Sequence, residues 1–426
     1  MTTSTRPAFA DKAIGTLDFW TATPERREAE IFAPLRATAP VSWQPPAQGT
    51  LPVVNPDEEG FWAVTGHREV IEVTQDPTTF CSRLGMMYED FPPEAYEAMA
   101  SIMAMDAPQH GRVRGLISAA FTPKRLVKIR DQIQAQAEQI VTDLLAVESG
   151  RGDFVQHVSA RLPLWTISEM VGVPPEDRDA MIDAVLKING FLDPAINEGR
   201  DPATVQQEGM LFLHAMAQQL AEQRRADPQD DLMTALVQAE IDGQHLTQMQ
   251  ISSFFVLLTA AGNDTTRNTT SVGMRALTLH PEQRSDLVAD LDGLLPVAIE
   301  EILRWASPVL TMRRTATRDV VIADAHIRKG DKVVLFYAAA NFDEKVFENP
   351  LEFDIRRSPN KHVSFGGGGP HFCLGNQLAK MQLTSLFTEL LTRVPDLEVG
   401  EPVYEINTTI RSIREMPFTF TPAAHD

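Results

Sequence analysis

The segment covering residues 247–280 predicts a single helix of unusual length, and this helix limits the possible folds more than any other feature. Thr247 and Gln250 form a capping-box pair at its start, and Pro281 marks its end. At 1.5 Å per residue such a helix would be about 50 Å long, enough to cross a domain. We therefore expect the rest of the chain to pack around it.

The remaining pattern is also mostly helical. Apolar residues recur at three- and four-residue spacing, for example over residues 122–145 and 210–225, and prolines separate such stretches. Strand-like segments are few and short: residues 61–65, 320–322, 332–336 and 418–421. No Gly/Ser tract, charge block or fixed-period repeat divides the chain. The sequence thus predicts a mainly α fold with small β-sheets, as one domain over residues 1–426.

Charge and hydropathy exclude several classes of partner. The formal net charge is −20, which argues against nucleic acid and anionic membranes, because both favour basic surfaces. The first ten residues are polar and lack the apolar core of a signal peptide. The longest apolar run, around Phe254–Leu258, is far shorter than the roughly 20 residues that span a bilayer. We expect a cytoplasmic protein without a membrane span.

Only two cysteines are present, Cys81 and Cys373. A disulfide framework and an all-cysteine metal cluster are therefore excluded. Cys81 has no distinctive neighbours and is expected to be a small buried residue. Any sulfur chemistry must come from one thiol acting alone.

Cys373 lies in the most distinctive stretch of the chain, residues 365–375, which contains four consecutive glycines. Glycines let a backbone approach a flat ligand closely, because no side chain intervenes. An amphipathic segment follows, so Cys373 should lie at a helix N-terminus, where the dipole and free N–H groups favour thiolate. The alternative is a glycine-rich turn with a buried structural cysteine.

Polar residues interrupt the middle of the long helix at Gly262, Asn263, Asp264 and Thr265. Gly inside a helix costs about 1 kcal/mol relative to Ala, so the loss of helix stability there suggests a function. A polar kink in a core helix would be the structural alternative.

Together these motifs resemble, in content and order, those of the cytochrome P450 superfamily. The glycine-rich segment is similar to the loop that carries the cysteine ligand, although Phe365 stands eight residues before Cys373 where seven is usual. Residues 261–266 resemble the oxygen-activation motif, and Glu301 with Arg304 matches a Glu-x-x-Arg motif. The resemblance implies haem b (iron protoporphyrin IX) between the long helix and the cysteine loop, with dioxygen as co-substrate.

The resemblance also implies residue roles. Cys373 would be the iron ligand, Asp264 would gate proton delivery, and Thr265 would hydrogen-bond the dioxygen and its waters. Glu301 and Arg304 would hold the cysteine loop with a third partner, for which Arg357 is preferred and Arg356 is the competitor. The haem propionates would be bound by four cationic or donor side chains: His110, Arg114, Arg314 and His371.

The chain further resembles an actinobacterial subgroup that hydroxylates methyl-branched lipids and sterol side chains. We therefore expect hydroxylation of an unactivated C–H bond in such a lipid or in a terpenoid. The expected substrate contacts come from a Met-rich segment, from the long helix and from the wall opposite it: Met86, Met87, Met103, Leu257, Ala260, Ala261 and Val309.

Electrons should come from another protein, because the sequence holds no flavin or nicotinamide motif. The resemblance suggests a ferredoxin with an NAD(P)H-dependent reductase. Basic residues near the cysteine loop could steer such an acidic carrier, or could be scattered solvated charges: Lys124, Arg125, Lys128, Arg130, Arg356, Lys361 and Lys380. The alternatives are a peroxide-driven haem-thiolate peroxygenase, which usually lacks the acid–threonine pair, and a non-catalytic haem-binding sensor.

Overall fold

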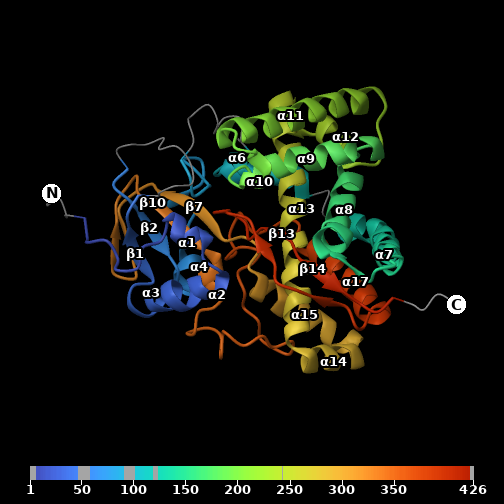
Figure 1. The fold of residues 1–426 in the computed structure, drawn as a ribbon. Helices are drawn as coiled ribbons and strands as arrows, with labels where there is room; N and C mark the ends of the chain where they lie inside the picture. The colour runs from blue at the N-terminus through green and yellow to red at the C-terminus, as the bar shows by residue number, and fades with distance from the viewer. Residues whose placement is uncertain (1–5, 47–57, 91–100, 119–122, 242, 423–426) are drawn as a thin grey trace.

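The computed structural model describes residues 6–46, 58–90, 101–118, 123–241 and 243–422 (Figure 1). Most of them are helical. The α-helices are α1 (Leu17–Thr21), α2 (Pro24–Arg27), α3 (Ala33–Thr38), α4 (His67–Gln75), α6 (Gln109–Ser118), α7 (Pro123–Leu145), α8 (Arg161–Val171), α9 (Arg178–Asn189), α10 (Pro194–Asn197), α11 (Pro202–Ala226), α12 (Leu232–Gln238), α13 (Gln248–Leu279), α14 (Pro281–Ala289), α15 (Leu291–Ala306), α16 (Tyr337–Ala340) and α17 (Asn376–Arg393).

The long helix predicted for residues 247–280 is α13, and it runs through the middle of the molecule (Figure 1). Its start is the expected capping box: Thr247 Oγ1 accepts from the Gln250 N–H at 3.2 Å, and the Gln250 side chain accepts from the Thr247 N–H at 2.9 Å. Helix α14 begins directly at Pro281. The sequence-based prediction of this helix and of both its ends is confirmed.

The strands form small sheets, of which the largest lies beside the N-terminal helices, whereas β13 and β14 lie near α13 and α17 (Figure 1). The largest has the order β1-β2-β10-β7-β3, in which β2 and β10 are parallel and the other pairs antiparallel. The strands are β1 (Val41–Gln44), β2 (Phe61–Val64), β3 (Phe80–Cys81), β4 (Arg151–Asp153), β5 (Glu240–Ile241), β6 (Gln244–His245), β7 (Thr311–Ala316), β8 (Val320–Ile322), β9 (Ala325–Ile327), β10 (Lys332–Phe336), β11 (Glu398–Val399), β12 (Val403–Tyr404), β13 (Ile413–Glu415) and β14 (Pro417–Thr419). The mainly α architecture with small sheets is as predicted.

Several short strands were not predicted, and the bounds of one helix differ from the sequence-based expectation. The helix predicted for residues 210–225 begins earlier, at Pro202, because Asp201 caps it by accepting from the Thr204 N–H. Strand β7 was not predicted, because Arg313 and Arg314 in its centre obscure the apolar alternation. Both arginines are nevertheless buried.

The largest apolar core lies where α7, α15 and α17 pack around the C-terminal half of α13. A second core joins α8, α9, α11 and α12 to the N-terminal half of the same helix. Because both halves are packed on other elements, α13 is a rigid frame for residues near its centre. Within the described ranges, none of the helices is both long and apolar enough to cross a membrane.

Candidate functional site

The cysteine loop is held in a tight backbone conformation ahead of α17. The Cys373 N–H donates to the Phe365 carbonyl at 3.0 Å, and the Gly366 N–H donates to the Val363 carbonyl at 2.8 Å. Gly366, Gly368 and Gly369 have positive φ values of 95°, 90° and 72°, a region that favours glycine. These contacts place the cysteine three residues before the first turn of α17.

The glycines are also needed for packing on α4. A Cβ on Gly369 would come within 2.6 Å of the Thr74 carbonyl oxygen, and one on Gly367 within 3.2 Å of the Ile71 Cα. From the sequence, the glycines were expected to allow close approach of a ligand. The structure adds two further reasons, backbone conformation and contact with α4.

The Cys373 side chain is accessible to solvent although the loop lies within the fold. Burial raises the pKa of its thiol, while the Gly375 N–H and the nearby Arg114 guanidinium act in the opposite direction. The Cys373 sulfur is thus reached by solvent and is also closely surrounded by protein atoms. We call the space in front of it, next to Arg114, the recess. The Gly375 N–H acts in the direction expected at a helix N-terminus, and a thiolate at Cys373 stays a prediction for the iron-bound protein.

The four predicted propionate partners lie together near this recess. The rings of His110 and His371 are 4.2 Å apart between centroids, and Arg114 donates to the Phe372 carbonyl. Burial together with the Arg314 and His110 charges lowers the pKa of His371 to about 3. Burial and the Arg114 charge likewise lower the pKa of His110.

This cluster fits a buried dianionic group. His110 is buried, and its Nε2 has no hydrogen-bond partner among the residues that the structure describes. The Arg114 and Arg314 charges disfavour protonation of the two nearby histidines. The two carboxylates of haem propionates would offset this repulsion. Ser82, which was not predicted, also belongs to the cluster, and its hydroxyl lies 3.3 Å from His371 Nε2. Because Ser82 is far from the loop in sequence, no local signal could have identified it.

The middle of α13 is accessible on one side only. Ala261 is exposed, and Leu257, Ala260 and Thr265 are half-buried, whereas Asn263 and Asp264 are buried. The exposed face of a central helix must border space inside the fold. The Thr265 hydroxyl lies on this face and donates to the Ala261 carbonyl at 3.0 Å.

Asp264, three residues after Ala261, is nevertheless buried and is held from several directions. Its Oδ2 accepts from Asn189 Nδ2 at 2.5 Å, and its Oδ1 accepts from Asn263 Nδ2 at 3.0 Å. An Arg267 nitrogen lies 3.6 Å from Oδ1. The carboxyl is therefore oriented by α9 as well as by its own helix.

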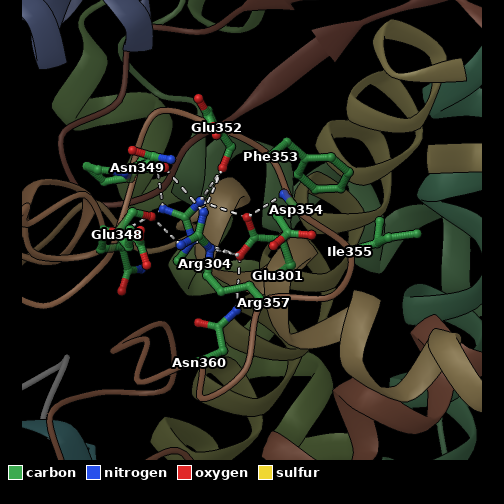
Figure 2. Close-up of polar contacts among 12 residues, drawn as sticks. Glu301, Arg304, Glu348, Asn349, Glu352, Phe353, Asp354, Ile355, Arg357 and Asn360 are labelled. Atoms are coloured by element: carbon green, nitrogen blue, oxygen red, sulfur yellow. Dashed lines mark hydrogen bonds and ion pairs between the residues drawn. The ribbon is translucent and has the colours of Figure 1, made fainter. Parts of the chain in front are cut away.

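Glu301 is the centre of a buried ion-pair network (Figure 2). It accepts from Arg304 at 2.8 Å through both oxygens, and from Arg357 Nε at 3.1 Å. Arg304 and Arg357 also donate to backbone carbonyls of the segment 348–352. The competitor Arg356 instead pairs with Asp286 on the surface. Of the two candidates for the third partner, the structure places Arg357 in the network.

A small cleft of about 40 Å³ lies at the end of α9, where its lining residue Asn189 contacts Asp264. It is lined by the end of α9, the following turn, the loop before β13 and the segment after Gly85. Its residues are Met87, Glu89, Ile188, Asn189, Phe191, Leu192, Asn407, Thr408, Thr409 and Ile410.

Only part of the predicted substrate set lies at this cleft. Met87 lines it, and Val309 pairs with the lining residue Ile410 in a β-bridge. Met86 is buried, while Met103 and Leu257 pack on the second apolar core. The rest of the Met-rich segment, residues 91–100, lies outside the described residues. The lining residues from α9 and the C-terminal loop were missed, because only the tertiary fold brings them to the site.

The predicted basic surface is only partly described. Arg356 pairs with Asp286 and Lys380 with Glu300, so neither is a free cation. Lys361 and Arg130 are exposed. The side chains of Lys124, Arg125 and Lys128 lie outside the described residues.

Comparisons with known proteins agree with this geometry. The family model described as Cytochrome P450 matches residues 94–394. A methyl-branched lipid omega-hydroxylase of Mycobacterium tuberculosis is 40% identical over 417 residues, covering 97% of this chain and 95% of that protein. A steroid C26-monooxygenase of Rhodococcus jostii is 37% identical over 408 residues, covering 94% of this chain and 83% of that protein. A Mycobacterium marinum cytochrome P450 in complex with pseudoionone superposes with a TM-score of 0.94 at 45% identity, covering 98% of this chain and 100% of that one.

Proposed function

This chain belongs to the cytochrome P450 family, whose monooxygenases use haem b with dioxygen as co-substrate, and we propose that it hydroxylates a terminal methyl group of a methyl-branched lipid or sterol side chain. The observation that carries the proposal is the position of Asn189. This residue lines the cleft and also donates a hydrogen bond to Asp264. A substrate in the cleft would thus contact a residue that orients the proposed proton-relay acid.

The chemistry of the cleft favours an apolar substrate. Its polar side chains are largely used within the protein: Asn407 donates to the Asn189 carbonyl at 2.7 Å, and its own Oδ1 accepts from the Thr409 and Ile410 N–H groups. Thr408 donates to Glu89. The groups left to contact a ligand are mainly the apolar side chains: Met87, Ile188, Phe191, Leu192 and Ile410.

The relatives narrow the substrate class. Two of them are named for omega-hydroxylation of methyl-branched lipids and for C26 oxidation of steroids, both at the end of an alkyl chain. The structural neighbour holds pseudoionone, a branched unsaturated ketone. The apolar side chains of the cleft suit the end of a branched alkyl chain, and a terpenoid is the smaller alternative substrate.

The chain's own residues define the proposed mechanism. Haem supplies the activation of dioxygen when it is bound in the recess. Cys373 would hold it from one side, and His110, Arg114, Arg314 and His371 would bind its propionates. Ala261 leaves room on the accessible face of α13 because its side chain is small.

Proton control would fall to two neighbouring side chains on α13. Asp264 would carry protons from the buried side by turning its carboxyl, and the Thr265 hydroxyl would pass them on after leaving the Ala261 carbonyl. Such a relay is needed when electrons arrive singly from a protein partner. The relay therefore favours a ferredoxin and its reductase, rather than peroxide, as the source of oxidising equivalents and electrons. It also favours a catalytic role over haem binding without turnover.

The first experiment is an optical titration of the ferric holoenzyme with a methyl-branched fatty acid, a sterol ketone and a monoterpene alcohol. A saturable spin-state shift with the branched acid or the sterol, followed by a terminally hydroxylated product, supports the proposal. A shift only with the small terpenoid would overturn the lipid assignment.

A second experiment identifies the electron source. Product should form with NAD(P)H, a surrogate ferredoxin and its reductase, and not with hydrogen peroxide alone. Equal product with peroxide would favour the peroxygenase alternative, and no product from either system would favour the haem-binding sensor.

A further inference from the structure

A second buried carboxyl, Glu405, is connected to the Asp264 site through α13. Glu405 follows β12 and is 8% exposed. Its Oε2 accepts from the Ser412 hydroxyl at 2.5 Å, and that hydroxyl accepts from Arg267 Nη2 at 3.1 Å. The other terminal nitrogen of Arg267 is the one that lies 3.6 Å from Asp264. One guanidinium thus lies between two carboxyl groups.

Strands β12 and β13 form a hairpin near the C-terminus, and this C-terminal hairpin holds the arrangement in place. The Glu405 N–H donates to the Ser412 carbonyl at 3.0 Å, and Asn268 on α13 accepts from the Ile413 N–H at 2.8 Å. Ser412, Arg267 and Asn268 are all at least nine-tenths buried. The link is therefore a fixed part of the packing between hairpin and α13, not a surface contact.

The charges in this region do not balance if every carboxyl is ionised. The titratable and charged groups that face Glu405 from the described elements are Asp264 and Arg267 on α13, and Asp193 after α9. Asp193 is already neutralised by Arg414, whose Nη1 donates to Oδ1 at 3.0 Å and to Oδ2 at 3.1 Å. Arg267 remains as the single cation for Asp264 and Glu405. Burial raises the pKa of Glu405 above its ordinary value, and the nearby Asp264 and Asp193 add to this effect.

We propose that Glu405 is a positioning residue for the proton relay: while it is protonated, Arg267 serves Asp264 alone, and when it ionises it draws Arg267 toward the hairpin. This inference rests on the relay role proposed for Asp264. With Arg267 drawn away, Asp264 loses one of the contacts that hold its carboxyl in place. Its carboxyl then turns more readily toward Thr265, and turnover rises with pH as Glu405 ionises.

The test compares pH profiles of turnover for the holoenzyme and two variants. Wild-type turnover should rise through the titration of Glu405, whereas Glu405→Gln and Ser412→Ala should both lose this rise. Glu398→Gln, which changes an exposed carboxyl on β11, is the matched control and should keep it. A wild-type profile without the rise, or a rise that persists in either variant, would overturn the proposal.

Difference infrared spectroscopy gives a readout that does not depend on turnover. The carbonyl stretch of a protonated carboxylic acid should be present on the acid side of the Glu405 titration in wild type and in Glu398→Gln, and lost in Glu405→Gln. Ser412→Ala should retain the band while its turnover becomes independent of pH. If the band is unchanged in Glu405→Gln, Glu405 holds no proton and the proposal is wrong.

Failure of the relay can be distinguished from failure of this inference. Asp264→Asn should bind haem and substrate but turn over slowly. Unchanged turnover in that variant would remove Asp264 from the relay, whatever the infrared titration shows. Slow turnover in Asp264→Asn together with a wild-type pH profile in Glu405→Gln would remove only Glu405.

Discussion

Asn189 Nδ2 donates to Asp264 Oδ2 at 2.5 Å, although 75 residues separate them in the chain. Asn189 is the last residue of α9, and Asp264 is buried in the middle of α13. Because Asn189 also lines the cleft, one side chain joins the candidate substrate site to the candidate relay. Substrate binding and proton delivery can therefore influence each other through a single contact.

Replacing Asn189 should uncouple reductant consumption from product formation. A hydrogen bond to a charged group contributes about 1.5–3 kcal/mol, so we expect Asn189→Ala to lower the product formed per NAD(P)H by about tenfold. The carboxyl of Asp264 would no longer be oriented on its Oδ2 side. Lys187→Ala, on the same helix and paired with Asp183, is the control and should couple normally. Normal coupling in Asn189→Ala would separate this contact from proton delivery.

The two neighbouring arginines before the cysteine loop should differ strongly in their effect on stability. Removing one partner of a buried ion pair costs about 3–5 kcal/mol, so Arg357→Ala should sharply lower the free energy of unfolding and promote loss of haem. Arg356→Ala breaks an exposed pair with Asp286 and should cost about 1 kcal/mol or less. Chemical denaturation and haem retention measure both effects. Similar losses in the two variants would contradict the network in Figure 2.

The ion pairs of Asp90, which follows the cleft residues Met87 and Glu89, should make the stability of the fold sensitive to acid. Burial alone would raise its pKa, but Arg313 and Lys332, both hydrogen-bonded to it, lower it below the ordinary 3.8. A carboxyl whose folded pKa is depressed contributes stability above its ordinary pKa and loses it as pH falls through the folded value. Asp90→Asn should therefore have a lower Tm than wild type at neutral pH and a smaller drop below about pH 4. Parallel Tm profiles for the two proteins would exclude this contribution.

The sequence predicted those parts of the site that depend on local pattern. Thr247, Gln250 and Pro281 define α13 because capping and termination are short-range effects. The spacing of Glu301 and Arg304 already indicates a pair on one helix face. Cys373 is recognisable from the glycines before it and the amphipathic helix after it.

The remainder depends on tertiary contacts that no local pattern encodes. Asn189 is an ordinary polar residue at a helix end, and Glu405 is one acid among many in a strongly acidic chain. Their significance comes from packing α9 and the C-terminal hairpin against α13.

The most direct test of the account is the carbon monoxide spectrum of the reduced holoenzyme, in wild type and in Cys373→Ser. If Cys373 is the iron ligand, wild type shows the thiolate-type Soret band and Cys373→Ser loses it, while Cys81→Ser retains it. Persistence of the thiolate-type band in Cys373→Ser would contradict the assignment of Cys373 and the site built around it.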